Sequence, residues 1–191
     1  MIEILLYIVL IIILIYIMAL LYNIYLLNNK SMMNHNINNN YNKILNNLFL
    51  GDIHTAQNID FIKKNNIKYI FNISNGIPNY FDYIPDIKYI NLNIADDLSD
   101  YSINLMYKNL PKLVLELDTY LNLKNGNVLV HCYAGRQRSA IVIAGYLVYK
   151  YKMTPDEAYD FIIDHRPEAF HYGSSYNFHN SLKKYYNDLY N

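Results

Sequence analysis

The sequence has a single cysteine, Cys132, among 191 residues, and it has no tryptophan. One cysteine cannot form an intramolecular disulfide, and nothing in the cysteine content indicates an oxidising compartment. An excess of charge of one sign is also missing, because 16 Lys and Arg residues balance 16 Asp and Glu residues. No nucleic-acid partner is therefore expected. The six histidines lack the spacing of metal ligands, so we expect no metal site.

A long apolar run opens the chain. Every residue from 4 to 22 is apolar or tyrosine, and the run reaches Leu27 with only Asn23 interrupting it. A helix needs roughly 20 such residues to cross a membrane. A secretory signal fits less well, because Glu3 replaces the usual positive charge and no small-residue cleavage site follows. A buried globular helix also fits less well, since the run has no polar face. We interpret residues 1–27 as a transmembrane anchor.

The charges around this run predict its orientation. Glu3 precedes it, whereas Lys30 and Lys43 follow it. The positive-inside tendency then makes this a single-pass membrane protein with its C-terminal part in the cytosol. The Asn-rich residues 28–43 are typical of a flexible linker. Residues 44–191 form the predicted globular domain.

Strand and helix patterns alternate through the globular part, which is typical of an α/β fold with helices packed on a central sheet. A domain of about 150 residues can bury enough surface to fold without a metal or a disulfide. The predicted strands cover residues 48–51, 68–74, 88–95 and 127–130. The predicted helices cover 54–66, 103–123 with a kink or break near Pro111, a helix opened by a capping box at 154–157, and a last helix capped by Ser174 or Ser175 that runs toward Tyr190.

The chemistry of the chain is concentrated in residues 128–147. A hydrophobic strand leads into a loop of five residues between Cys132 and Arg138, and an apolar helix follows. Such a loop points several backbone N–H groups into one concavity, which suits a phosphate. Gly135 lets the loop turn, and the planar guanidinium of Arg138 can hold two phosphate oxygens. Positive surroundings favour the thiolate, so we expect attack on phosphorus through a cysteinyl-phosphate intermediate.

Some neighbours of the cysteine are expected to support the sulfur or the loop, and others are expected to bind the substrate phosphate. Ser139 lies close enough in sequence to donate a hydrogen bond to the sulfur, although a helix N-cap is an alternative role. His131 is expected to be buried and to order the loop through hydrogen bonds rather than to transfer protons. The residues expected to bind the substrate phosphate are Tyr133, Ala134, Gly135, Arg136, Gln137 and Arg138.

Residues 131–139 match the pattern H-C-x5-R-S, and the chain therefore resembles the protein tyrosine and dual-specificity phosphatases. Further segments at 48–51, 71–74, 89–96 and 145–148 extend the resemblance through the globular part. It implies a dual-specificity phosphatase fold, in which helices flank a central mixed β-sheet. It also implies a phosphoric monoester hydrolase that needs no metal or other cofactor.

A phosphatase of this kind needs a general acid that protonates the departing oxygen. In the family, an Asp on a loop after a strand does this. Asp96 aligns best, because the alternation of Leu92 and Ile94 leads to it. Asp97 is the second candidate and Asp100 the third, and capping of the following helix is the alternative role for these acids.

The loop that carries the candidate general acid, Asp96, also indicates which substrates the chain accepts. The strictly tyrosine-specific branch has Trp-Pro-Asp there, whereas residues 95–97 of this chain are Ala-Asp-Asp. The resemblance therefore implies hydrolysis of phosphotyrosine and of phosphoserine or phosphothreonine in phosphoprotein partners.

Two alternatives remain open. A membrane-tethered phosphatase of anionic phospholipids is suggested by the charge of Arg136 and by the anchor. Against it, Tyr133 stands where the lipid-specific branch has a basic residue. A phosphoprotein-binding pseudophosphatase is the other alternative, and the presence of Cys132 and Arg138 argues against it.

Overall fold

The computed structural model describes residues 16–18, 20, 40–97, 99–170 and 178–191. The chain divides into two units, Met1–Asn39 and Asn40–Asn191. In the first unit, the described residues 16–18 and 20 are helical. Within the described parts of the chain, no helix is long and apolar enough to cross a membrane. Most of the predicted anchor lies outside the described residues, as do linker residues 28–39, Ser174 and Ser175.

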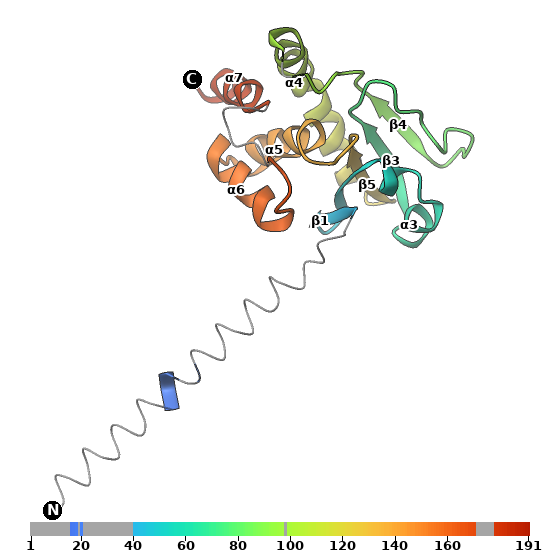
Figure 1. The fold of residues 1–191 in the computed structure, drawn as a ribbon, viewed down its shortest axis with the longest axis horizontal. Helices are drawn as coiled ribbons and strands as arrows, with labels where there is room; N and C mark the ends of the chain where they lie inside the picture. The colour runs from blue at the N-terminus through green and yellow to red at the C-terminus, as the bar shows by residue number, and fades with distance from the viewer. Residues whose placement is uncertain (1–15, 19, 21–39, 98, 171–177) are drawn as a thin grey trace, which may run out of the picture. The chain divides into compact units, whose positions relative to one another are not determined.

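The second unit is built on a mixed sheet, as predicted, and this sheet has five strands where the sequence indicated four (Figure 1). Its strand order is β1-β2-β5-β3-β4, in which β1 runs antiparallel to β2 and the other neighbours are parallel. The sheet therefore places the strand that leads to Cys132 at its centre. The strands are β1 (Tyr41–Leu45), β2 (Leu48–Gly51), β3 (Ile67–Asn72), β4 (Lys88–Asn91) and β5 (Asn127–His131).

Helices cover both faces of the sheet. The numbered helices are α2 (Ile53–Ala56), α3 (Ile59–Lys64), α4 (Asp100–Leu123), α5 (Arg138–Tyr151), α6 (Pro155–His165) and α7 (His179–Tyr190). Figure 1 shows α3 on one side of the sheet and α4 to α7 on the other. Side chains of β5 alternate between the two layers, with Val128 and Val130 in the larger core and Leu129 in the smaller one.

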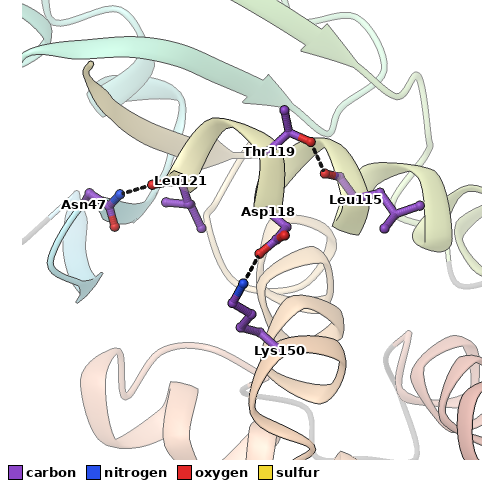
Figure 2. Close-up of polar contacts among 6 residues, drawn as sticks. All are labelled: Asn47, Leu115, Asp118, Thr119, Leu121 and Lys150. Atoms are coloured by element: carbon purple, nitrogen blue, oxygen red, sulfur yellow. Dashed lines mark hydrogen bonds and ion pairs between the residues drawn. The ribbon is translucent and has the colours of Figure 1, made fainter. Parts of the chain in front are cut away.

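Contacts between α4, α5 and the β1–β2 turn fix one edge of the larger layer (Figure 2). Lys150 on α5 pairs with Asp118 on α4 at 2.8 Å. The amide of Asn47 in the turn donates to the Leu121 carbonyl on α4 at 3.0 Å. Thr119 bonds back to the carbonyl of Leu115 one helical turn earlier. The first hairpin is therefore attached to the C-terminal end of α4.

The first strand begins within the range assigned to the linker. Residues 41–43, predicted to end the linker, belong to strand β1. The burial along this strand alternates, with Asn42 and Ile44 buried and their neighbours Tyr41 and Lys43 exposed, and this alternation is the pattern of a half-buried strand. The Asn-rich composition concealed it, because the strand presents a buried asparagine where a hydrophobic residue is usual.

Several element boundaries also differ from expectation. The helix predicted over 54–66 is two short helices, because Asn58 caps the second one by accepting from the Phe61 N–H at 3.0 Å. Pro111 does not break α4, where it lies on the exposed face of the helix. Strand β4 ends at Asn91, before the predicted end at residue 95. The capping box is confirmed at the start of α6.

Candidate active site

Cys132 directly follows the central strand β5, and its side chain is only 1% exposed. The Ser139 hydroxyl donates a hydrogen bond to its sulfur at 3.2 Å. Helix α5 begins at Arg138, and its N-cap residue is Gln137, which makes no side-chain capping bond. Ser139 therefore lies inside the first turn, where its hydroxyl contacts the sulfur instead of capping the helix. The strand, loop and helix predicted around the cysteine are all present.

Arg138 links the loop to the segment after β4. Its side chain is 6% exposed, and its Nη1 donates to the carbonyl of Ile94 at 3.1 Å. Its Nη2 lies 3.3 Å from Oδ2 of Asp96, whose side chain is 40% exposed. The two residues predicted to bind phosphate and to supply the proton thus lie side by side, although 42 positions separate them in the sequence.

The other two acids lie at the start of α4. Oδ1 of Asp97 accepts hydrogen bonds from the backbone N–H and the hydroxyl of Ser99, at 3.0 and 2.9 Å. Hydrogen bonds from the side chain of Ser102 and from Ser99 lower the pKa of Asp97, which favours its charged form. Asp100 is the first residue of the helix. The N-cap of α4 is Ser99, whose side chain accepts from the Ser102 N–H, so neither acid is itself the cap; Asp97 bonds to the capping residue, and Asp100 places a negative charge in the first turn.

Gly135 has a backbone conformation that the loop requires. Its φ is +64°, in the left-handed region. A β-carbon at this position would lie 2.5 Å from the carbonyl oxygen of Gly51, at the end of β2. The loop can therefore approach the neighbouring strand closely only with glycine here.

The remaining loop residues differ in exposure. Tyr133 is 63% exposed, Ala134 is partly buried and Arg136 is exposed. Gln137 is buried, and neither polar atom of its amide makes a hydrogen bond to a described residue. Buried polar groups are nearly always paired, so this buried amide leaves hydrogen-bonding capacity of the loop unused among the described residues.

His131 directly precedes Cys132 at the end of β5. The residue is buried, as predicted. Burial disfavours the charged ring and lowers the pKa of His131 to about 4. A hydrogen bond with the backbone of Cys132 opposes this shift without cancelling it, so the buried ring is neutral at pH 7.

The structure adds Arg166, which the sequence reasoning missed. It follows α6, is 3% exposed, and donates from Nε to the Gly135 carbonyl at 2.7 Å and from Nη2 to the Ala134 carbonyl at 3.3 Å. Its Nη1 donates to Oδ1 of Asn42 on β1 at 2.7 Å. No spacing marks this residue, because it lies 31 positions beyond Gly135 and outside the motif.

Backbone donors hold the two neighbouring carbonyls of the loop. The Ile53 N–H at the start of α2 donates to the Tyr133 carbonyl at 3.0 Å. The Phe170 N–H donates to the Arg136 carbonyl at 2.9 Å. Backbone contacts of this kind leave no trace in side-chain chemistry, so a sequence pattern cannot reveal them.

Metal ligation finds no support in the described parts of the chain, where no three His, Cys, Asp or Glu side chains gather to hold an ion. The arrangement instead combines a buried thiol, a hydroxyl on its sulfur, a buried guanidinium and an adjacent carboxylate. These groups can bind a phosphate, attack its phosphorus and donate a proton.

Comparison with known proteins identifies the family of this domain. Residues 48–188 match the family model for the dual specificity phosphatase catalytic domain. Human dual specificity protein phosphatase 9 is 35% identical over 120 residues, which are 63% of this chain and 30% of that protein. Human dual specificity protein phosphatase 7 is 36% identical over 120 residues, or 63% of this chain and 27% of that protein. The chain thus spans about a third or less of the length of these relatives.

Solved structures show the same fold. A crystal structure of human DUSP28 superposes with a TM-score of 0.68 at 22% identity, and the match covers 80% of this chain and 97% of that one. The match to the family model covers most of the chain, including the segment from Cys132 to Ser139. The chain belongs to the dual specificity phosphatase family.

Proposed function

We propose that this chain hydrolyses phosphotyrosine and phosphoserine or phosphothreonine in proteins through a cysteinyl-phosphate intermediate. The observation that carries the proposal is the buried thiol of Cys132, which accepts a hydrogen bond from Ser139 within a loop that ends at Arg138. Family membership and the neighbouring carboxylate of Asp96 support it.

In the first step, the loop N–H groups, the start of α5 and Arg138 bind the phosphate oxygens. The thiolate of Cys132 attacks phosphorus, so that an S–P bond forms and the P–O bond to the substrate breaks. Asp96 gives its proton to the departing oxygen, which leaves as an alcohol or phenol. Because Asp96 pairs with Arg138 before the substrate arrives, phosphate binding can separate the two and leave the carboxyl beside the leaving group.

In the second step, water cleaves the intermediate. The Asp96 carboxylate takes a proton from the water, an O–P bond forms, and the S–P bond breaks to release inorganic phosphate. The hydrogen bond from the Ser139 hydroxyl stabilises the departing thiolate of Cys132. The enzyme then returns to its initial protonation state without any cofactor.

A phospholipid substrate is the second candidate. The guanidinium of Arg136 is exposed beside the loop, where it suits an anionic headgroup. The proposed anchor at residues 1–27, with the catalytic domain on the cytosolic side, holds the site near lipid. Its support is the apolar run at 4–22 with its flanking charges. Alkaline extraction of membranes from expressing cells tests this anchor, because a chain recovered in the supernatant would contradict it.

The proposed activity is tested by phosphate release from the full chain. The substrates are phosphotyrosine and phosphothreonine peptides and, separately, phosphatidylcholine vesicles that carry a phosphatidylinositol phosphate. Peptide turnover should fall by at least about 10³-fold in Cys132→Ser, because this variant removes the nucleophile. Binding of tungstate should persist in it, since the loop and Arg138 remain.

The outcomes separate the alternatives. Turnover of vesicles alone would replace the protein substrate with a phospholipid. Tungstate binding without turnover by the wild-type chain would indicate a phosphoprotein-binding module.

A further inference from the structure

The phosphate-binding loop is held on its outer side, away from Cys132. The carbonyls of residues 133–136 accept hydrogen bonds from Ile53, Arg166 and Phe170. In a trans peptide, the carbonyl of one residue and the N–H of the next point in opposite directions. Fixing these four carbonyls outward therefore turns the N–H groups of residues 134–137 inward, toward the position of a bound phosphate.

Arg166 is the one side chain among these three donors, and its geometry suits the task. Its Nε and Nη2 each contact a different loop carbonyl, while its Nη1 contacts Asn42. Three nitrogens of one rigid plane thus bond to three acceptors, an arrangement that the point charge of a lysine cannot reproduce. Arg166 is 3% exposed, so water is a poor substitute for these contacts.

Asn42 fixes the far side of this guanidinium. It lies on β1, 124 positions from Arg166 in the sequence, and it is 8% exposed. It also precedes residues 48–188, the part of the chain that matches the family model. The first strand of the domain thus connects to the phosphate-binding loop through the contact between Asn42 and Arg166.

We propose that Arg166 is a positioning residue for the phosphate-binding loop and that Asn42 holds the guanidinium of Arg166 in its working orientation. The expected effect on kcat rests on the proposed function. The expected effect on anion binding rests on the geometry alone. Phosphoryl transfer needs the loop N–H groups aimed at the equatorial oxygens, so a small rotation of these peptides weakens binding of the transition state.

The electrostatics of the loop agree with this role. Burial lowers the pKa of the Arg166 guanidinium, and the charges of Glu168, Asp52 and Cys132 oppose this shift. An arginine remains charged under such conditions. Arg166 therefore adds a fixed positive charge near the sulfur without occupying the space of the substrate.

A matched pair of substitutions at Asn42 tests the proposal in the full chain. Asn42→Asp keeps the oxygen that accepts from Nη1, whereas Asn42→Leu removes it and keeps the branched shape of the side chain. We expect Asn42→Leu to lower kcat about 10-fold and to weaken inhibition by orthovanadate by a similar factor, with KM changing less. Asn42→Asp should stay within about threefold of the wild type for both quantities, because a carboxylate accepts the same hydrogen bond.

Substitution of the arginine should have the larger effect. Arg166→Lys keeps the charge but loses the planar donors, and we expect kcat and vanadate affinity to fall about 100-fold. Asn47→Leu is the matched control, because it removes another amide contact of the same hairpin, to the Leu121 carbonyl on α4. It should lower the melting temperature without changing kcat or vanadate affinity at temperatures where the chain is folded.

Vanadate affinity and phosphate release together separate failure of the role proposed for Arg166 from failure of the proposed phosphatase activity. The proposal is overturned if folded Asn42→Leu and Arg166→Lys bind vanadate and turn over as the wild type does, whatever their melting temperatures. If the wild-type chain binds vanadate but releases no phosphate, the proposed function fails, and vanadate titration of the same variants still decides the role of Arg166. Failure of the wild type to bind vanadate would refute both.

Discussion

Helix α5 carries polar side chains at both ends, and they meet opposite surroundings. At its N-terminal end, Arg138 and Ser139 are 5% and 0% exposed. At its C-terminal end, the side chain of Lys150 is 39% exposed and pairs with Asp118 across to α4 (Figure 2). Burying a charge or hydroxyl is unfavourable unless partners replace water, whereas an exposed ion pair loses little and gains little. The fold therefore keeps its energetically demanding polar groups at one end of this helix.

At the buried N-terminal end of α5, and in the loop before it, several polar atoms also lack hydrogen-bond partners among the described residues. Nε of Arg138 and the amide atoms of Gln137 make no hydrogen bond to a described residue. Such atoms reduce stability in the free protein. Nε of Arg138 and Nε2 of Gln137 carry N–H donors that a phosphate could use, so the same groups that weaken the free fold can strengthen the complex. The exposed end of α5 has no comparable role.

The sharpest test of this comparison lies in the two adjacent acids near the buried end. Asp96 contacts Arg138, whereas Asp97 bonds to Ser99 at the start of α4. We expect Asp96→Asn to lower kcat for a phosphotyrosine peptide by about 10²–10⁴-fold, because the departing oxygen loses its proton donor. A substrate with a better leaving group, p-nitrophenyl phosphate, should lose less. Steady-state kinetics on both substrates measures the difference.

Asp97→Asn is the matched control, with the same change of charge one residue away. It should reduce kcat by no more than about threefold, and its effect should appear in thermal unfolding, because an acceptor at the start of α4 is weakened. Equal losses in the two variants would assign the effect to general electrostatics of the loop. A large loss in Asp97→Asn alone would transfer the acid role to that residue.

The sequence predicted the groups of the loop that would face a phosphate. It missed the groups that bond to the loop carbonyls from the opposite side. Cys132, Arg138 and Ser139 are consecutive parts of one motif, and their chemistry can be inferred because the strand–loop–helix context fixes where they point. Arg166 and Asn42 act through hydrogen bonds to backbone carbonyls, and the topology brings them together from distant segments. Such contacts depend on tertiary geometry, which residue spacing does not encode.

The fold shows the same division. The alternation of Val128, Leu129 and Val130 between two cores follows from apolar residues alone, and β5 lies where it was predicted. Strand β1 was missed because its buried position 42 is an asparagine, whose side-chain oxygen accepts a hydrogen bond from the distant Arg166. Propensity also failed at Pro111, where packing of the buried face of α4 maintains the helix.

His131 provides a test of stability at the buried end of the comparison. Its pKa is about 4 in the folded chain, compared with 6.5 for the unperturbed ring. Between these values the unfolded chain binds more protons, so the contribution of His131 makes the folded state less stable as the pH falls from about 7 to about 4. The loss should reach about 3 kcal/mol at the acid end. Urea unfolding at successive pH values measures it.

His131→Phe, which cannot be protonated, should flatten this part of the pH dependence. His54→Gln is the control, because His54 is exposed on α2, and its pH dependence should follow that of the wild type. Carboxylates change the stability over the same pH range in the wild type and in both variants. The difference between the stability curves of the wild type and His131→Phe therefore gives the contribution of the His131 ring. An unchanged slope in His131→Phe would show that the ring is protonated without penalty in the folded chain.

The smallest effect is expected at the opposite end of α5, where Lys150 and Asp118 pair at 2.8 Å. Lys150 is partly exposed, so ordering of its long side chain and screening by salt offset most of the attraction. Asp118→Asn should change the free energy of unfolding by less than about 1 kcal/mol, and added salt should reduce that difference further. Urea unfolding at low and high ionic strength measures both. A loss of several kcal/mol that salt does not diminish would mean that this end of the helix depends on its charges as strongly as the buried end, and the contrast between the two ends would fail.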